Sequence, residues 1–279
     1  MKILITGAKG QLGTELADNA DRQRHELILA DMEEFDLTDK TSIGSFLEKT
    51  KSDLIINCAA FTQVDAAEAD GEVARKVNAD APETMAAWCK ENGARMIQIS
   101  TDYVFSGNHS SPYSVDDLPD PQSAYGRTKL EGERKVLEAD GNAIIIRTAW
   151  LYSPYGKNFV KTMLKLMAER EELKVVGDQI GSPTSAADLA RAILKIMELD
   201  GVRGIFHFTN EGVASWYDLA QAIAEYSGSK CRVLPIKTEE YPTPAKRPAY
   251  SVLDKSKIKE LIGPIRHWRE ALKDSLGNA

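Results

Sequence analysis

Short runs of Ile, Leu and Val alternate with helix-like patterns along the first half of the chain. Nearly every position within these runs is apolar, which is typical of strands that helices cover on both faces. Regular alternation of such strands with helices predicts an α/β protein with a doubly wound parallel sheet. The predicted strands are residues 2–6, 26–30, 53–57, 94–99 and 143–147.

After residue 150 the pattern loosens. Helices are predicted at about 158–170 and 185–198 and short strands at 173–176 and 204–208. A proline-rich stretch from Leu234 to Leu253 predicts an irregular segment, of the kind that a protein keeps for binding or for wrapping its own surface. We therefore expect a first domain at 1–150 and a smaller C-terminal α/β domain at 151–279, with some later segments returning to the first.

Composition excludes several classes of protein. Of the 279 residues, 43% are hydrophobic and 28% are charged, which is ordinary for a globular protein. The apolar runs are far shorter than the ~20 residues that span a bilayer, and the first strand begins too early for a signal sequence, so we expect a cytoplasmic protein without a membrane segment. The net charge of −7, with basic and acidic residues interleaved, argues against nucleic acid as a partner.

The cysteines and histidines show no metal-ligand spacing. We expect reduced, buried thiols and structural histidines, and no metal site built from these residue types. The residues are Cys58, Cys89, Cys231, His25, His109, His207 and His267.

A glycine-rich turn joins the first predicted strand to a helix. Gly7, Gly10 and Gly13 permit a tight turn, let backbone N–H groups approach a pyrophosphate, and let the helix pack close to the strand. Their G-x-x-G-x-x-G spacing departs from the G-x-G-x-x-G dinucleotide-binding pattern. An ordinary strand-to-helix turn is therefore the alternative interpretation of these residues alone.

Acidic residues follow the second predicted strand. Asp31 stands where a carboxylate accepts hydrogen bonds from the adenosine ribose, which favours NAD(H) without excluding NADP(H). Asp36 and Leu37 open the next loop in a pattern suited to an adenine contact. Because Glu33 and Glu34 are also acidic, a solvated turn explains Asp31 equally well.

A phenol and an ammonium lie four residues apart at the predicted start of another helix. Tyr125 and Lys129 therefore share a helix face. A neighbouring positive charge favours phenolate and lowers the pKa of a tyrosine, which makes Tyr125 a candidate general acid. Two solvated residues on a helix surface are the alternative for an isolated Tyr-x-x-x-Lys match.

These candidates gather at one edge of the predicted sheet. In an open α/β sheet, ligands bind at the carboxyl ends of the strands. The glycine turn follows the first strand, Asp31 the second, Ala59–Phe61 the third and Ser100–Tyr103 the fourth. Their agreement supports a single binding site more strongly than any one motif does.

In this order the motifs resemble the extended short-chain dehydrogenase/reductase superfamily, which implies a Rossmann-like fold. Within the superfamily the chain is similar, nearly end to end, to the dTDP-4-dehydrorhamnose reductase family. The superfamily motifs are Thr6–Gly13, Asn57–Ala60, Ser100–Phe105 and Tyr125–Lys129. The motifs shared with the reductase family are Phe61–Glu68, Arg147–Tyr152, Asn158–Met163, Asp178–Thr184 and Tyr241–Pro248. The resemblance makes 1–150 the NAD(P)-binding domain and 151–279 mainly the substrate-binding domain.

The resemblance implies reduction of the 4-keto group of dTDP-4-dehydro-β-L-rhamnose to dTDP-β-L-rhamnose by hydride transfer from NADPH or NADH, for cell-surface polysaccharide. Tyr125 would donate the proton, Lys129 would lower the pKa of Tyr125 and hold the nicotinamide ribose, and Thr101 would hydrogen-bond the carbonyl oxygen. Thr101 replaces a more familiar serine, but the role needs only a hydroxyl. The implied cofactor-binding residues are Gly7, Gly10, Gln11, Leu12, Gly13, Asp31, Asp36, Leu37, Ala59, Ala60, Phe61, Tyr125 and Lys129.

The resemblance also assigns substrate contacts. Thr101, Asp102 and Trp150 would contact the sugar, and Arg247 would bind the pyrophosphate. A core anchor is the alternative for Trp150, and a surface arginine the alternative for Arg247. Glu15 lies where some family members place a magnesium ligand at a dimer contact, but no partner carboxylates are evident near the C-terminus. A homodimer and Mg²⁺ are therefore left open.

Two other functions fit the same motifs. A sugar-nucleotide 4-epimerase uses the same three residues but returns the hydride and keeps its NAD bound, so cofactor turnover separates it from a reductase. A non-catalytic NAD(P)-binding regulatory subunit would retain the fold, and the intact Thr101, Tyr125 and Lys129 argue against it.

Overall fold

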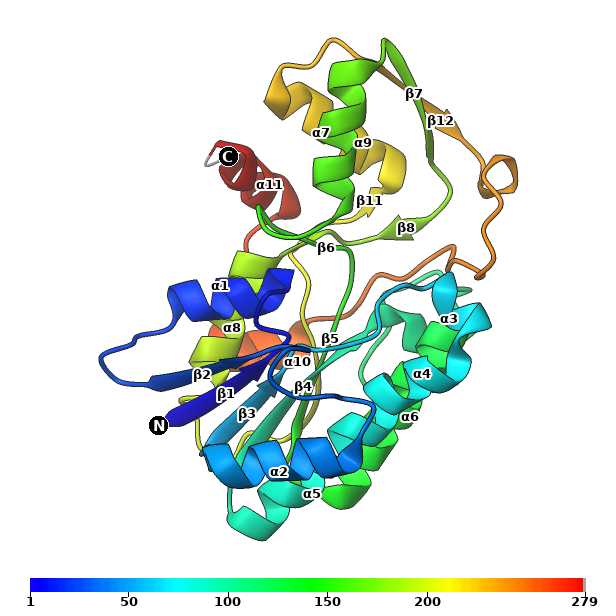
Figure 1. Cartoon of the computed structure of the whole chain (residues 1–279). Coiled ribbons are helices and arrows are strands. Elements are labelled where there is room, and N and C mark those ends of the chain that lie inside the picture. The colour runs from blue at the N-terminus through cyan, green and yellow to red at the C-terminus, as the bar shows by residue number, and fades with distance from the viewer. Residues whose placement is uncertain (278–279) are drawn as a thin grey trace.

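A six-stranded parallel sheet forms the centre of the larger lobe in the computed structural model, which describes residues 1–277 (Figure 1). The strand order is β10-β5-β4-β3-β1-β2. The strands are β1 (Lys2–Thr6), β2 (Glu26–Ala30), β3 (Leu54–Asn57), β4 (Arg95–Thr101), β5 (Ile144–Thr148) and β10 (Gly204–His207). From β1 the chain goes first to β2 on one side and then to β3 on the other, and ligands of such sheets bind at the carboxyl ends beside this switch.

Helices cover both faces of the sheet, which explains why its strands are apolar throughout. In β1, Ile3 and Ile5 join one hydrophobic cluster while Leu4, between them, joins the other. The first cluster packs under α1 (Gln11–Asn19), α8 (Ala186–Ile196) and α10 (Ser256–Ile262). The second packs under α2 (Lys40–Thr50), α5 (Ala81–Asn92) and α6 (Ala124–Ala139). The prediction of a doubly wound α/β sheet is confirmed.

The smaller lobe has its own hydrophobic core. It contains α7 (Phe159–Glu169), α9 (Trp216–Ser227), α11 (Trp268–Gly277) and the parallel pair β7 (Glu172–Val176) and β12 (Arg232–Ile236). Two short pairs, β6 (Leu151–Tyr152) with β9 (Thr184–Ser185) and β8 (Ile180–Gly181) with β11 (Ala214–Ser215), lie between this core and the large sheet. Figure 1 shows this lobe beyond the carboxyl ends of the large sheet.

The chain passes between the lobes more than once. Although α8, β10 and α10 follow residue 150, they pack on the large sheet. The proline-rich segment then returns from β12 to α10 through a short turn, η3 (Thr238–Glu240). Because of this return, segments from both halves of the sequence meet at the edge where the candidate residues gather.

The helical region before β4 is interrupted. It consists of α3 (Ala66–Ala69), α4 (Gly71–Arg75), the π-helical turn η1 (Lys76–Asp80) and α5. Single π-turns within helices are frequent at functional sites. This one places Asn78 against the loop after β3.

The fourth strand extends to Thr101, beyond the predicted end at residue 99. Ser100 and Thr101 pair with Arg147 and Thr148 of β5, and this ladder prolongs the strand. A short turn, η2 (Asp102–Val104), follows directly. Thr101 and Asp102 are therefore fixed by the sheet rather than by a mobile loop.

None of the helices within residues 1–277 is long and apolar enough to cross a membrane.

Candidate functional site

The glycine turn after β1 has the geometry of an anion-binding site. Gly7 has a φ of +63°, which favours glycine, and its carbonyl accepts a hydrogen bond from the amide of Gly10 at 2.9 Å. A Cβ at Gly13 would lie 2.3 Å from the Gly7 carbonyl oxygen, so only glycine lets α1 pack this closely. Gly10 caps α1 without a side-chain hydrogen bond, which leaves the first N–H groups of the helix available to a phosphate.

The other predicted cofactor residues surround this turn. Asp31 directly follows β2 and accepts a hydrogen bond from the amide of Lys9 at 3.0 Å, so its carboxylate lies against the glycine turn. The carboxylate of Asp36 accepts two hydrogen bonds from Thr38, which hold its pKa below the usual range. Leu37 packs on the core beneath.

Asn78, a residue that the sequence motifs do not single out, connects the loop after β3 to α6. Its side chain accepts from the amide of Phe61 at 2.9 Å and donates to the Phe61 carbonyl at 3.1 Å. It also donates to Thr128 of α6 at 3.1 Å. Ala59, in the same loop, donates from its amide to Thr6 at 3.4 Å. No spacing rule marks an asparagine in a π-turn, so only the fold could show this contact.

Thr101 and Tyr125 lie together at the end of β4. Ser123 caps α6 by accepting a hydrogen bond from the amide of Gly126 at 3.1 Å, so the helix begins one residue before Tyr125. Burial raises the pKa of Tyr125 above its usual value, and a hydrogen bond with Thr101 opposes that shift. Tyr125 therefore keeps its proton at neutral pH, contrary to the lowered pKa that the sequence suggested. The main group acting against burial is the Thr101 hydroxyl rather than the Lys129 charge.

Lys129 lies deep beneath the site, where it is only 3% exposed. Its ammonium donates to the carbonyl of Ile99 at 2.6 Å. Burial lowers the pKa of Lys129 to about 8, and the negative charge of Glu133 opposes the shift. The alternative interpretation, in which Lys129 is a solvated residue on a helix surface, is wrong, because Lys129 is buried near the carboxyl ends of the strands.

Asp102 is buried beside Thr101, from which it accepts a hydrogen bond at 3.0 Å. Its other carboxylate oxygen, Oδ2, is buried without a hydrogen-bond partner among the described residues. Burial raises the pKa of Asp102 to about 6, while the nearby hydroxyls of Ser251 and Thr101 act against the shift. A buried acceptor of this kind suits a ligand hydroxyl, and without one it is a cost to folding.

This cost gives a pH-dependent prediction. Between about pH 4 and pH 6 the folded protein binds a proton at Asp102 that the unfolded chain has lost, so the free energy of unfolding falls as pH rises through this window. Asp102→Asn removes the cost, and we expect it to stabilise the protein by up to about 3 kcal/mol near pH 8 and much less near pH 4. Urea unfolding of both proteins at the two pH values measures the difference. An effect of equal size at both would contradict the assignment.

Trp150 belongs to an aromatic group at the base of the smaller lobe. Its ring stacks on Trp216 with centroids 3.6 Å apart and an interplanar angle of 7°, and Phe159 packs against Trp216. Trp150 has a φ of +50°, a left-handed conformation that is unusual for a bulky residue. The left-handed backbone and the stacking on Trp216 together fix the position of the Trp150 indole.

Arg247 reaches the site from the proline-rich segment. It donates to Asp65 at 2.6 Å, and Asp65 also accepts from the amide of Ala245 at 3.1 Å. Its Nη1 atom is buried without a hydrogen-bond partner among the described residues. Burial raises the pKa of the neighbouring Tyr103 to about 12, and the Arg247 charge opposes that shift. Arg247 is thus neither a free surface arginine nor fully paired.

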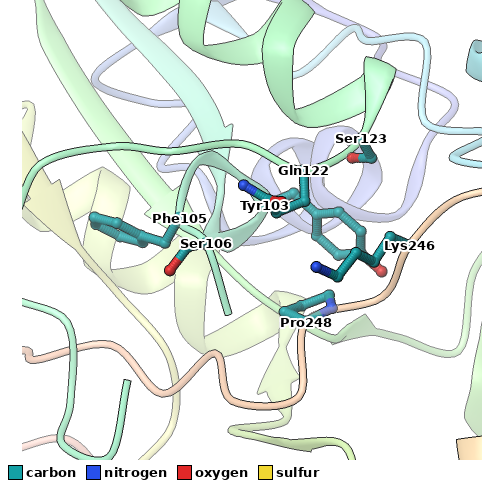
Figure 2. Close-up of a pocket in the computed structure, with 7 residues that line it drawn as sticks. All are labelled: Tyr103, Phe105, Ser106, Gln122, Ser123, Lys246 and Pro248. Atoms are coloured by element: carbon teal, nitrogen blue, oxygen red, sulfur yellow. The ribbon is translucent and has the colours of Figure 1, made fainter. Parts of the chain in front are cut away.

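Figure 2 shows a small pocket lined in part by the two sequence neighbours of Arg247, Lys246 and Pro248. Lys246 and Pro248 of the proline-rich segment lie across it from Tyr103, Gln122 and Ser123. The ring of Tyr103 also packs edge-on against Tyr125, with centroids 5.5 Å apart. The pocket therefore adjoins Tyr125 at the start of α6.

Glu15 lies on α1, away from any cluster of metal ligands. Its side chain hydrogen-bonds Asn19 at 3.4 Å, and burial with the nearby charge of Asp18 raises its pKa. No group of three His, Cys, Asp or Glu side chains suited to a metal ion occurs in residues 1–277. The suggestion of a magnesium site at Glu15 gains no support.

Comparisons with known proteins find similarity over the whole chain. Residues 1–279 match the family model described as "RmlD substrate binding domain". A dTDP-4-dehydrorhamnose reductase of Mycolicibacterium smegmatis is 43% identical over 99% of this chain and 85% of its own length. A solved reductase of the same name from Clostridium acetobutylicum has 46% identity and a TM-score of 0.96, covering 100% of this chain and 99% of its own. Another from Bacillus anthracis, solved with NADP, has 38% identity, a TM-score of 0.96 and the same coverage.

Proposed function

The chain belongs to the dTDP-4-dehydrorhamnose reductase family, and from that premise we propose that Thr101, Tyr125 and Lys129 are its catalytic residues. Its reaction is the NAD(P)H-dependent reduction of dTDP-4-dehydrorhamnose in rhamnose and polysaccharide biosynthesis. The observation that carries the residue assignment is the meeting of the Thr101 and Tyr125 hydroxyls at the end of β4, with the buried Lys129 one helical turn away.

The residues around β1 and β2 fit a dinucleotide. The close approach of Gly13 to Gly7 and the uncapped N-terminus of α1 leave room and N–H donors for a pyrophosphate. Asp31, tied to the same turn, presents a carboxylate that suits ribose hydroxyls. When bound, the reduced nicotinamide supplies a hydride to the keto carbon.

The chain's own residues supply the proton. Because its pKa is raised, Tyr125 holds a proton at neutral pH that it donates to the keto oxygen. The Thr101 hydroxyl, whose single proton Asp102 accepts in the structure, would turn to donate a hydrogen bond to the same oxygen, where negative charge develops. Lys129, whose pKa of about 8 keeps most of it charged at neutral pH, stabilises the resulting phenolate and holds the nicotinamide ribose.

The substrate contacts are proposed from the remaining side chains. Asp102 has an unpartnered carboxylate oxygen for a sugar hydroxyl, and the Trp150 indole offers an apolar face. Arg247 has an unpartnered Nη1 for the substrate pyrophosphate, although its Nη2 must share or leave Asp65. Preference between NADPH and NADH, a cytoplasmic location and a homodimer stay predictions.

An isotope experiment tests the reaction. With the transferable hydrogen of NADPH or NADH replaced by deuterium, we expect one deuterium at C4 of the product for each cofactor oxidised. A 4-epimerase would return the hydrogen and leave no net oxidised cofactor. A regulatory subunit would bind the cofactor and transfer nothing. Either result would contradict the proposal.

The position of Trp150 offers a substrate-specific test. A Cβ at Gly181 would lie 2.6 Å from the Trp150 ring, so Gly181→Ala must displace the indole. We expect the KM for the sugar nucleotide to rise roughly tenfold while the KM for the cofactor is unchanged, as loss of one aromatic contact implies. The matched control is Gly177→Ala, where the nearest atom to the new Cβ is Pro235 at 3.4 Å, an ordinary contact. A rise in both variants, or in neither, would contradict the role of Trp150.

A further inference from the structure

A buried ion pair lies directly beneath the catalytic residues. Glu133 on α6 and Arg147 on β5 are 2% and 1% exposed. Arg147 binds the carboxylate through two nitrogens, Nε to Oε1 at 2.9 Å and Nη2 to Oε2 at 2.6 Å. Ser100 of β4 donates its hydroxyl to Oε1 at 2.5 Å. Three elements of the larger lobe therefore hold one carboxylate in place.

The position of this carboxylate relates it to catalysis. Glu133 follows Lys129 by four residues on the same helix, so the two side chains share a face. Ser100, which binds Glu133, immediately precedes Thr101, and Ile99, which accepts from the Lys129 ammonium, precedes Ser100. Three successive residues at the end of β4 therefore have linked roles. Ile99 binds the Lys129 ammonium, Ser100 binds the Glu133 carboxylate, and Thr101 is the proposed partner of the substrate carbonyl.

We propose that Glu133 is a positioning residue of the reductase, whose carboxylate, bound by Arg147 and Ser100 and one helical turn from Lys129, keeps Lys129 charged for catalysis. The inference rests on the proposed role of Lys129. A purely structural buried pair would be replaceable by well-packed apolar residues at little cost to activity. Here the carboxylate of the pair also has to stabilise the Lys129 ammonium, because burying an ammonium costs free energy unless a negative group is near.

The groups that face Lys129 leave Glu133 as its main source of negative charge. Burial lowers the pKa of Lys129, and Glu133 is the largest opposing influence. Cys58 at the end of β3 contributes little negative charge, because burial raises its pKa to about 12. Tyr125, on the same helix, keeps its proton because its pKa is also raised. Glu133 is therefore the main source of negative charge for the ammonium.

The groups that face Glu133 from the other elements fix its own charge. Arg147 comes from β5 and Ser100 from β4. His207 of β10 lies 3.4 Å from Arg147 and stays neutral, because burial and the Arg147 charge lower its pKa to about 3. From the π-turn, Asn78 contacts α6 through the neutral Thr128. Asp80 pairs with Lys135 farther along the helix.

The test measures the charge of Lys129 directly. Lysine labelled with ¹³C at Cε gives NMR signals that titrate with the ammonium, and Lys129→Met assigns the signal by its loss. In Glu133→Gln we expect the pKa of Lys129 to fall by on the order of one unit or more, as removal of a nearby opposite charge implies. Glu138→Gln, an exposed position on the same helix, is the matched control and leaves the pKa unchanged.

A double variant keeps the proposal testable if Glu133→Gln alone fails to fold. Glu133→Gln leaves Arg147 unpaired, whereas Glu133→Gln with Arg147→Met removes both buried charges together and is less damaging. The pKa of Lys129 falls in this paired variant too. An unchanged Lys129 titration in the folded variants would overturn the proposal.

Activity provides the second readout. Because Lys129 acts as an ammonium, kcat/KM is lost as pH rises through its pKa, so the alkaline limb moves to lower pH in Glu133→Gln by the shift seen in the NMR titration. A limb that stays in place would overturn the positioning role. Absence of turnover in the wild type would overturn the proposed function instead, while the NMR titration still decides whether Glu133 charges Lys129.

Discussion

Tyr125→Phe is expected to lower kcat by about 10²- to 10⁴-fold while leaving cofactor affinity nearly unchanged, because it removes the proton donor but keeps the ring. The ring packs against Tyr103 through its edge, a contact that phenylalanine preserves. Steady-state kinetics combined with quenching of protein fluorescence by NADPH and NADH measures both quantities.

The matched control is Tyr155→Phe. Tyr155 is partly exposed and donates to Asp18 at 2.8 Å, so its hydroxyl is engaged at the surface. This variant is expected to retain wild-type kcat. If Tyr125→Phe turned over at the wild-type rate, Tyr125 would not be the acid.

Gly13→Ala is expected to abolish measurable cofactor binding and to destabilise the protein. The new Cβ would lie 2.3 Å from the Gly7 carbonyl oxygen and 2.6 Å from the Cα of Ala8, and both are backbone atoms that can move only if α1 shifts. Because the first turn of α1 provides the N–H groups for the pyrophosphate, the shift removes the site as well as the packing. Thermal unfolding with and without NADPH measures both effects.

Gly44→Ala makes the same chemical change within α2, where a new Cβ meets nothing within 4 Å. There alanine is the better helix former, and we expect stabilisation by about 0.5–1 kcal/mol. Normal stabilisation by cofactor in Gly13→Ala would contradict the role of the turn. Equal destabilisation by both substitutions would show that the Gly13 effect is not specific.

The strands and the nucleotide edge of the larger lobe could be predicted because they depend on local patterns. Continuous apolar runs are required where helices cover both faces, and β1 and β2 have the predicted bounds. β4 ends later than predicted because its extension depends on pairing with β5, which no local pattern reveals. The glycine turn was predictable for the same local reason, since Gly7 needs a positive φ.

The electrostatics of the site could not be predicted from spacing alone. The sequence places Lys129 on the same face as Tyr125, but burial dominates both pKa values and moves that of Tyr125 upward. Burial depends on packing by the whole lobe. Partners such as Glu133 with Arg147, and Asp65 with Arg247, are brought together by tertiary folding, and the second pair is 182 residues apart in the chain.

The smaller lobe was the harder part to predict. Its core joins α7, α9 and α11 around a two-stranded sheet, and the intervening α8 and β10 belong to the larger lobe. A linear pattern does not show which lobe a helix packs against, because either core accepts the same apolar face. The left-handed backbone of Trp150 could not be predicted either, because no local pattern marks a positive φ at a tryptophan.

The most direct test is consumption of the reduced nicotinamide, followed by its absorbance, when purified protein receives dTDP-4-dehydrorhamnose generated in place from dTDP-glucose. A reductase predicts oxidation of one NADPH or NADH for each sugar nucleotide added, and no oxidation without it. Intact cofactor binding with no substrate-dependent oxidation would contradict the assignment of this site as a reductase.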